Sequence, residues 1–232
     1  MRQFPVMIFA AGFGTRMGAL TREVPKPLIT VGGKALLDHA LDIADLAPVS
    51  RRVVNAHYHA DQIARHVVNR NVAVSCEEGM ILETGGGLRL AMPLLAESPV
   101  MTLNSDAVWT GRNPLQELAA AWDPDTMDAL LLLAPIEATK GFAGKGDFRL
   151  DQSGRLIRAN GQPGLVYLGA QILRTDTLPA IAQPVFSLNL IWDRMIADGR
   201  AYGITHQGAW CDVGRPEGIA EAESLLGWHK DG

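Results

Sequence analysis

Short apolar runs of β-type residues recur along the first half of the chain, and stretches with a helical spacing of apolar residues separate them. The runs predict strands at Val6–Ala10, Arg52–Ala56, Val72–Cys76, Val100–Asn104 and Ala129–Ile136. The stretches between them predict helices at Ala35–Ala47, Asp61–Val68, Gly86–Leu95 and Pro114–Trp122. This alternation is typical of an α/β protein with a Rossmann-like, mixed but mostly parallel sheet that has helices on both faces.

The second half of the chain has a different pattern. Asp147–Leu150 and Leu156–Arg158, joined by a Ser-Gly turn, predict a β hairpin. After a predicted strand at Leu165–Leu173, the remaining predicted elements are a helix at Leu188–Asp198, a short strand at Trp210–Val213 and a helix at Pro216–Leu226. Because the pattern shows no repeat or linker, we expect one domain over residues 1–232, with the hairpin as a small β insertion over the pocket.

The first predicted strand leads into a glycine-rich loop, Gly12-Phe13-Gly14-Thr15-Arg16, and Lys26 follows between two prolines. Glycines let backbone N–H groups approach phosphate oxygens closely, because no Cβ is in the way. Arg16 can donate to two phosphate oxygens, and Lys26 supplies a compact positive charge. The pattern predicts a nucleoside triphosphate as ligand. A dinucleotide fingerprint is excluded because Met17 replaces its third glycine, and no Walker A ending is present.

Two isolated carboxylates each follow a short apolar strand. Asp106 ends the segment Asn104-Ser105-Asp106, at the edge where open α/β sheets bind their ligands, and Asp212 ends a strand near the other end of the chain. Mg²⁺ prefers oxygen ligands, commonly one or two carboxylates with phosphates and water. Each Asp alone is also typical of a turn or a helix cap. Together with the phosphate loop, they predict a Mg²⁺ site.

Two further segments allow more than one interpretation. Gly85 begins a run of three glycines before a predicted helix, where a base and ribose or an anion could approach closely. The alternative is a flexible helix entry capped by Thr84. Asp147 could accept hydrogen bonds from sugar hydroxyls, or it could belong to a plain turn. The six histidines show no spacing typical of a zinc site.

The composition limits the partners. The chain is 47% hydrophobic and 20% charged, which is ordinary for a globular protein, and its net charge of −4 disfavours a nucleic-acid partner. No apolar run is long enough to span a membrane, and the N-terminal residues lack the pattern of a signal peptide. Cys76 and Cys211 match no metal or redox spacing. We therefore expect a cytoplasmic protein with no membrane partner, and we expect a monomer.

The chain resembles the sugar-1-phosphate nucleotidyltransferases over almost its whole length. The family signature, Leu-Ala-Ala-Gly-x-Gly-Thr-Arg-Met/Leu-x-Pro-Leu-Thr followed by Pro-Lys-Pro-Leu, is similar to residues 9–21 and 25–28. The resemblance continues through residues 83–87, 104–106, 146–150 and 212–214. The Glu-Thr-Gly-Gly-Gly and Gly-Asp-Phe-Arg-Leu segments are most similar to the branch that uses UTP and N-acetylmuramate 1-phosphate in bacterial cell-wall recycling. The resemblance implies a GT-A-like nucleotidyltransferase fold.

The resemblance also implies a role for each candidate residue. Residues 1–136 would bind the nucleotide, and residues 137–232 would bind the sugar and close the domain. The nucleotide-binding residues would be Ala11, Gly12, Gly14, Thr15, Arg16, Lys26, Glu78, Gly85 and Asn104. Within this set, Arg16 would hold the leaving pyrophosphate and Lys26 the α-phosphate, while Glu78 and Gly85 would lie near the base and ribose.

The remaining implied roles concern catalysis, the metal and the acceptor. Arg16, Lys26 and Asp106 would be the catalytic residues, and Asp106 and Asp212 would bind Mg²⁺. Asp147 and Gly169 would contact the sugar.

The sequence departs from the family pattern at three positions. Ala19 stands in place of the usual Pro and should loosen the loop slightly, and Phe9 replaces a Leu. Ser105 stands where a Gly usually precedes the metal-binding Asp. If that position requires a positive φ, Ser105 would cost about 1 kcal/mol in strain and shift the metal geometry.

The implied reaction is transfer of a uridylyl group from UTP to a sugar 1-phosphate, giving a UDP-sugar and pyrophosphate. One alternative is another pair of substrates, such as GTP or CTP with mannose or heptose 1-phosphate. A second is a catalytically silent nucleotide-binding module, which the presence of Arg16, Lys26, Asp106 and Asp212 disfavours. A kinase is disfavoured because the chain has neither a Walker A loop nor a kinase-type glycine loop.

Overall fold

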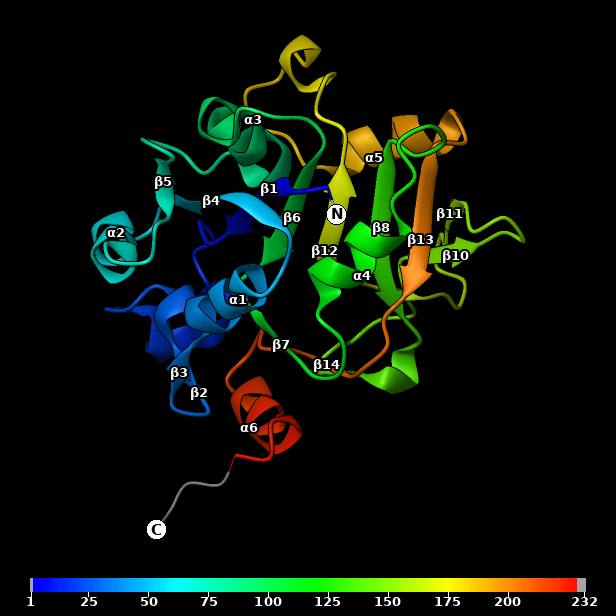
Figure 1. The fold of residues 1–232 in the computed structure, drawn as a ribbon. Helices are drawn as coiled ribbons and strands as arrows, with labels where there is room; N and C mark the ends of the chain where they lie inside the picture. Colours follow the sequence, from blue (N-terminus) through cyan, green and yellow to red (C-terminus); the bar gives the residue numbers. More distant parts are fainter. Residues whose placement is uncertain (1, 229–232) are drawn as a thin grey trace.

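A seven-stranded sheet forms the centre of the computed structural model, which describes residues 2–228 (Figure 1). Its strands lie in the order β13-β8-β12-β6-β1-β4-β5. Their bounds are β1 Phe4–Phe9, β4 Val49–Ala56, β5 Ala73–Cys76, β6 Val100–Asn104, β8 Ala129–Ala134, β12 Val166–Leu173 and β13 Ala201–Thr205. β1 pairs in parallel with β4 and β6, as do β4 with β5 and β13 with β8, whereas β12 runs antiparallel to both of its neighbours. The prediction of a mixed, mostly parallel sheet is confirmed.

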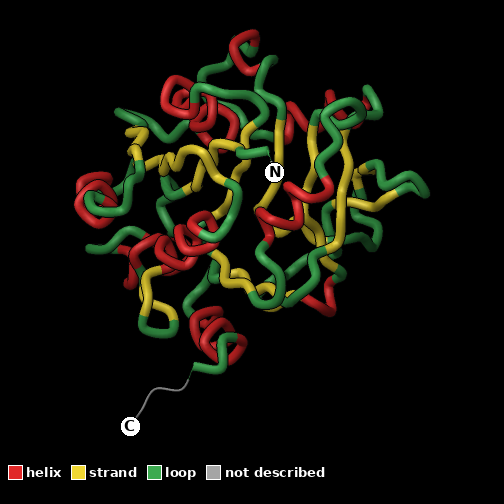
Figure 2. The backbone as a smooth tube through the Cα atoms, viewed as in Figure 1, coloured by secondary structure: helices red, strands yellow, loops and turns green. Residues whose placement is uncertain are grey.

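Helices cover both faces of this sheet (Figure 2). One face packs against helices α1 Leu36–Asp45, α2 Ala60–Val67 and α4 Pro114–Ala121, and the other against α3 Glu83–Leu95 and α5 Asn189–Ala197. The alternation along β1 explains the two layers: Val6 and Ile8 belong to one core, and Met7 belongs to the other. A parallel sheet buried on both sides needs such continuous apolar strands.

A third, smaller core lies beyond the carboxyl end of β1. It joins Met17 of the 3₁₀ segment η1 (Thr15–Thr21) to Val108, Cys211 and Val213 of a small sheet, and to Ala222 of helix α6 (Glu217–Leu225). The small sheet has the order β7-β14-β9, with β7 Ala107–Trp109, β14 Trp210–Asp212 and β9 Thr139–Lys140. A two-stranded ribbon, β2 Thr30–Val31 and β3 Lys34–Ala35, packs beside α6. Short 3₁₀ turns at η2 Lys26–Leu28, η3 Ile136–Ala138 and η4 Leu178–Ala180 complete the fold.

The predicted hairpin forms as β10 Phe148–Leu150 and β11 Leu156–Arg158. It lies beside the edge strand β13, where Arg155 bridges to Tyr202 (Figure 1). The hairpin insertion therefore lies at the edge of the central sheet that β13 forms. Since β12 and β13 lie within the central sheet, the second half of the chain is part of the same layered body.

The sequence pattern did not indicate every strand. β13 is an edge strand of the main sheet, and β7 and β9 have only three and two residues. Such short segments contain too little alternation to stand out from loops, and pairing with distant strands makes them extended.

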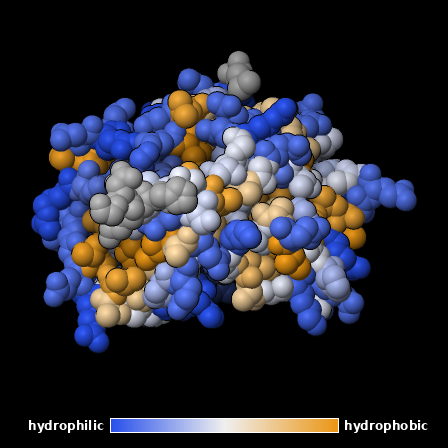
Figure 3. All heavy atoms as spheres, turned by 90° about the horizontal axis from the view of Figure 1, so that it is seen from below, coloured by the Kyte–Doolittle hydropathy of each residue, from blue (hydrophilic) through white to orange (hydrophobic). Residues whose placement is uncertain are grey.

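The face that carries α6 has hydrophilic and hydrophobic residues interspersed (Figure 3). Two exposed apolar residues elsewhere, Leu46 and Val68, directly follow α1 and α2, respectively. No helix within residues 2–228 is both long enough and apolar enough to cross a membrane.

Candidate functional site

The glycine loop begins where β1 ends and is held by a side chain of β4 and by close packing against Lys26. The Ala10 N–H donates to Asn55 Oδ1 at 2.7 Å, which fixes the start of the loop to β4. Gly14 has φ 63°, and a Cβ at this position would lie 2.8 Å from Lys26 Cβ. Only glycine combines this conformation with so close an approach. The loop therefore packs directly against the residue that the sequence analysis paired with it.

Lys26 is 8% exposed, and its Nζ donates to Asp106 Oδ2 at 2.6 Å. The flanking Pro25 is in an extended conformation, and Pro27 occupies the first turn of η2, so the two prolines fix the backbone on either side of the lysine. The structure thus brings together two of the three predicted catalytic residues, which are separated by 80 positions in sequence.

Asp212 lies beside Asp106 because β7 and β14 are neighbours. Asp212 is paired with Ala107, and the Val213 N–H donates to the Asp106 carbonyl at 2.8 Å. Burial, followed by the charge of Asp106, raises the pKa of Asp212 from 3.8 to about 6, although Lys26, Arg16 and Arg215 act in the opposite direction. At Asp212, burial and the neighbouring Asp106 therefore outweigh the effect of the three nearby cations.

This pair of carboxylates fits a hard divalent cation. Within residues 2–228, no group of three or more His, Cys, Asp and Glu side chains is arranged to hold a metal ion. The protein thus offers a pair of oxygen ligands, and Mg²⁺ commonly takes one or two carboxylates while phosphates and water complete its shell. A bound dication would offset both the burial and the charge of Asp106 that raise the pKa of Asp212.

A cavity of about 220 Å³ opens at this edge of the sheet. The residues lining it come from the ends of β1, β4 and β6, from the segment after β5 and from the start of α3. Among the predicted residues, Ala11, Gly12, Lys26, Asn104 and Asp106 line this cavity. The carboxyl ends of the parallel strands therefore form its floor, as expected for this class of sheet.

Glu77 is one of the acidic residues that line the cavity, whereas its neighbour Glu78 is exposed and is not among the lining residues. Glu77 is 3% exposed; its Oε1 accepts from Asn55 Nδ2 at 2.6 Å, and its Oε2 accepts from the Leu82 N–H at 2.7 Å. Glu77 thus connects β4 to the segment before α3. The signal that could have identified it is the strand alternation, because buried Ser75 and Glu77 are two residues apart.

The second glycine cluster serves the interior of the protein. The N–H groups of Gly85 and Gly86 donate to the Phe186 carbonyl at 2.9 and 3.1 Å, and a Cβ on Gly85 would lie 2.3 Å from the Phe186 ring. Gly85 is buried and is not among the residues lining the cavity, whereas Glu83 and Thr84 are. Glu83 has φ 59°, an unusual conformation for a non-glycine residue, directly in the cavity wall.

Gly169 and Asn104 lie against each other across β12 and β6. Gly169 has φ 82° and sits within the irregular register between Tyr167 and Gln171. A Cβ there would lie 2.7 Å from Asn104 Cγ. Gly169 therefore leaves the space that the side chain of Asn104 occupies beside the cavity.

Asp147 is exposed and supports the hairpin. Its Oδ2 accepts from the Tyr167 N–H at 2.8 Å, and its carbonyl accepts from the Ala159 N–H at 2.9 Å. It is not among the residues lining the cavity at the glycine loop, so a contact of Asp147 with a sugar stays a prediction.

Ser105 does not have the strained backbone that its place in the motif suggested. Within residues 2–228, Ser105 is not among the non-glycine residues with positive φ. Its Oγ donates to the Phe9 carbonyl at 2.6 Å, and its N–H donates to the same oxygen at 3.2 Å. The expectation of strain at Ser105 is wrong: the side chain instead ties the end of β6 to β1.

Arg16 and Thr15 begin η1 and are exposed to solvent. Arg16 lines a second cavity, outside the one just described, together with Arg215. Ala19, which replaces the usual proline, lines this cavity as well.

Comparisons with known proteins place the chain in a family and a fold. The family model of the MobA-like NTP transferase domain matches residues 6–182. The N-acetylmuramate alpha-1-phosphate uridylyltransferase of Caulobacter vibrioides is 40% identical over 97% of this chain and 99% of its own. The protein of the same name from Neisseria meningitidis is 33% identical, over 95% and 97% of the two chains. A crystal structure of UDP-glucose pyrophosphorylase complexed with UDP-glucose has the same fold, with a TM-score of 0.79 at 14% identity over 97% of this chain and 98% of that one.

Proposed function

The chain belongs to the family of MobA-like NTP transferase domains, and from this premise we propose that it transfers the uridylyl group of UTP to N-acetylmuramate 1-phosphate. The products are a UDP-sugar and pyrophosphate. The observation that supports the reaction class is the convergence of Lys26, Asp106 and Asp212 at the end of the glycine loop.

The chemistry requires that anions be brought together. A phosphate oxygen of the sugar 1-phosphate attacks the α-phosphorus of UTP, and the bond to the pyrophosphate oxygen breaks as the new P–O bond forms. The nucleophile is already an anion, so no general base is needed. Catalysis then depends on position and on positive charge at the transferring phosphoryl group.

Lys26 is the residue best placed to supply that charge. It is buried and fixed by its prolines, and its ammonium group is already directed into the cavity wall at Asp106. A preorganised cation of this kind loses little free energy to reorganisation when charge develops in the transition state. Backbone N–H groups of the glycine loop add further donors at the phosphates.

Asp106 and Asp212 would hold Mg²⁺, for which their oxygen ligands are suited. When bound, the ion neutralises phosphate charge and orients the triphosphate. The protein's own role is to present both carboxylates beside adjacent strands, and the pairing of β7 with β14 fixes this arrangement.

The substrate pair rests on the relatives. Two proteins with the same curated name match nearly the full length of this chain at 40% and 33% identity. A reaction of this kind would return a recovered cell-wall sugar to the nucleotide-sugar pool in the cytoplasm, and this location and pathway are part of the proposal.

The experiment is a pyrophosphate-release assay with purified protein. Each of the four ribonucleoside triphosphates is combined with N-acetylmuramate, N-acetylglucosamine, glucose, mannose or heptose 1-phosphate, with Mg²⁺ or with EDTA. We expect Mg²⁺-dependent release that is fastest with UTP and N-acetylmuramate 1-phosphate. Lys26→Ala is the inactive control, and Arg112→Ala, an exposed arginine that lines neither cavity, is the active control.

The other outcomes separate the alternatives. Faster release with another pair, such as GTP and mannose 1-phosphate, would keep the reaction class and overturn the substrate assignment. Release that persists in EDTA would overturn the role of Mg²⁺. No release with any pair, although nucleotide binds, would indicate a silent nucleotide-binding module.

A further inference from the structure

A second cavity of about 590 Å³ lies outside the glycine loop. One wall is η1, with Arg16, Gly18 and Leu20, and the other is the turn from β14 into α6, with Arg215 and Glu217. Two guanidinium groups and one carboxylate thus line the cavity. This charge balance favours an anion.

The two cavities lie along one continuous segment of chain. Residues 10–12 line the first cavity, and residues 16–20 line the second, with Gly14 packed on Lys26 between them. On the other side, Asp106 lines the first cavity, and Arg215 follows Asp212 by three residues. A ligand that extends along the loop past the two carboxylates would enter the second cavity with its far end.

The walls of the second cavity are held in place by the third core. Met17, next to Arg16, packs in one cluster with Val213 and with Ala222 of α6. The two arginine side chains form no ion pair or side-chain hydrogen bond with any residue between 2 and 228. They are therefore free to donate to a ligand, while the backbone that carries them is fixed.

We propose that Arg215 binds the terminal phosphates of the nucleoside triphosphate and the departing pyrophosphate, opposite Arg16 and in the second cavity. The proposal rests on the proposed function, because it assigns the far end of the same substrate. Guanidinium groups suit this ligand, since each can donate two parallel hydrogen bonds to phosphate oxygens.

The test is a calorimetric titration of the whole protein with magnesium pyrophosphate, and separately with UMP, which lacks the terminal phosphates. Arg215→Met keeps the aliphatic stem of the side chain and removes the charge, so that packing beside α6 is preserved. We expect its Kd for pyrophosphate to rise about tenfold, the effect of losing charge-assisted hydrogen bonds at an accessible site. We expect its Kd for UMP to stay within twofold of wild type. Arg112→Met is the control with the same change in net charge.

Three outcomes of the titration would overturn the proposal. A Kd for pyrophosphate in Arg215→Met within twofold of that in Arg112→Met would overturn the proposal, as would a wild-type protein that does not bind pyrophosphate. An equal loss of UMP and pyrophosphate binding would show a structural role and would also overturn it. Arg215→Lys keeps the charge and should retain part of the affinity. Because the titration needs no turnover, pyrophosphate binding that depends on Arg215 would stand even if no substrate pair reacts.

Discussion

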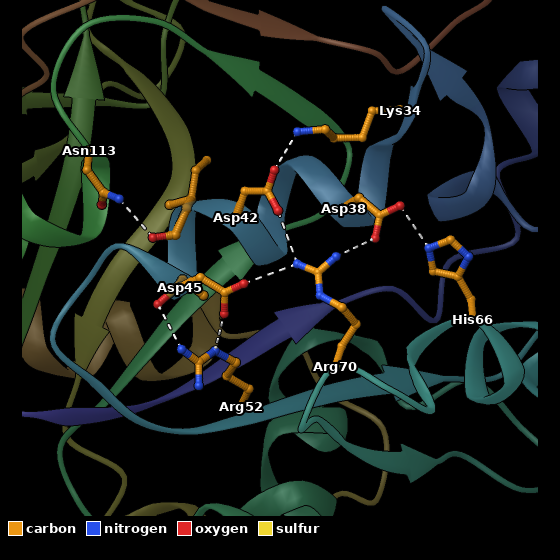
Figure 4. A network of polar contacts seen from close by, with 10 residues as sticks. Lys34, Asp38, Asp42, Asp45, Arg52, His66, Arg70 and Asn113 are labelled. Carbon is orange, nitrogen blue, oxygen red and sulfur yellow. Dashed lines mark hydrogen bonds and ion pairs between the residues drawn. The ribbon is translucent and has the colours of Figure 1, made fainter.

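Two acidic clusters of this protein are built in opposite ways. The first, here called the α1 network, consists of Asp38, Asp42 and Asp45 on one face of α1, with the cations around them (Figure 4). The second is the pair Asp106 and Asp212 at the glycine loop. Both place carboxylates close together, but they differ in how burial and the neighbouring cations balance.

In the α1 network, Arg70 contacts all three carboxylates, at 3.1, 3.1 and 3.2 Å. Lys34 pairs with Asp42, and Arg52 pairs with Asp45 at 2.9 Å. Partial burial alone would raise the pKa of Asp42, but hydrogen bonds from Lys34 and Arg70 hold it below 3.8. The carboxyl group of Asp42 is therefore more stable in the charged form in the folded protein than in the unfolded chain.

At the glycine-loop site the pKa of the carboxyl group shifts in the opposite direction. Burial and Asp106 together raise the pKa of Asp212 to about 6, despite the opposing charges of Lys26, Arg16 and Arg215. The folded protein therefore holds a carboxylate that is less stable in the charged form than it would be in water. The contrast indicates that the α1 network stabilises the fold, whereas the site is left short of positive charge that a ligand cation can supply.

The largest expected effect concerns the site. Lys26→Ala and Asp106→Ala should each lower kcat/KM by about 10²–10³ or more, because each removes a preorganised group from the reacting phosphates. Steady-state kinetics with the best substrate pair gives the loss, and circular dichroism checks that the fold is kept. Near-normal turnover by either variant would remove that residue from the catalytic assignment.

The next largest effect is expected when the α1 network is disrupted. Arg70→Met leaves three carboxylates without their shared cation and should lower the free energy of unfolding by about 1–3 kcal/mol. Thermal unfolding measures this loss, and KM for both substrates should not change. Arg65→Met is the matched control, since its partner Asp61 and Arg65 itself are 64% and 70% exposed, and such pairs contribute little. Equal melting temperatures of the two variants would refute the structural role of the network.

A smaller effect of opposite sign is expected at Asp212. The pKa of Asp212 in the folded protein lies above its ordinary value of 3.8, so ionisation of this carboxyl group destabilises the fold. The free energy of unfolding should therefore fall as pH rises from about 4 to about 6. In EDTA at pH 8, Asp212→Asn should therefore melt a few degrees above wild type, on the scale of about 2–4 °C per kcal/mol. Near pH 4 the difference should vanish.

Magnesium should reverse the order of the two proteins. Adding Mg²⁺ at pH 8 should raise the melting temperature of wild type more than that of Asp212→Asn. The ion stabilises the folded form by binding to it, and the variant lacks one of the two carboxylates proposed to bind it. Asp198→Asn, an exposed change of the same chemistry, is the control and should show neither effect. A variant that melts below wild type in EDTA would contradict the charge imbalance at the site.

The smallest effect concerns Ser105. Ser105→Ala removes one donor to the Phe9 carbonyl, but the backbone N–H of residue 105 still donates to that oxygen. We expect a loss of about 1 kcal/mol in unfolding free energy and a kcat within threefold of wild type. A tenfold drop in kcat would show that the hydroxyl group matters for the metal geometry.

Much of the layered fold could be predicted from the sequence. Short runs of β-type residues predicted the strands β1, β4, β5, β6, β8 and β12, because the pattern of apolar positions reports directly on burial. The glycine loop, Lys26 and Asp106 were identified from chemistry and spacing, and all of them meet at one edge of the sheet. Such features are local in the chain, or follow from the rule that parallel strands end on the same side.

Only the tertiary structure decided which distant residues meet. It put Glu77, and not its neighbour Glu78, in the cavity lining, placed Gly169 against Asn104, and set Arg215 across a cavity from Arg16. It also gave the three aspartates of α1 their cations and paired Asp106 with Lys26. The sequence by itself determined residue types and local periods. Distances between segments, and with them the charge balance that separates a stabilising cluster from a binding site, arise only when the layers pack.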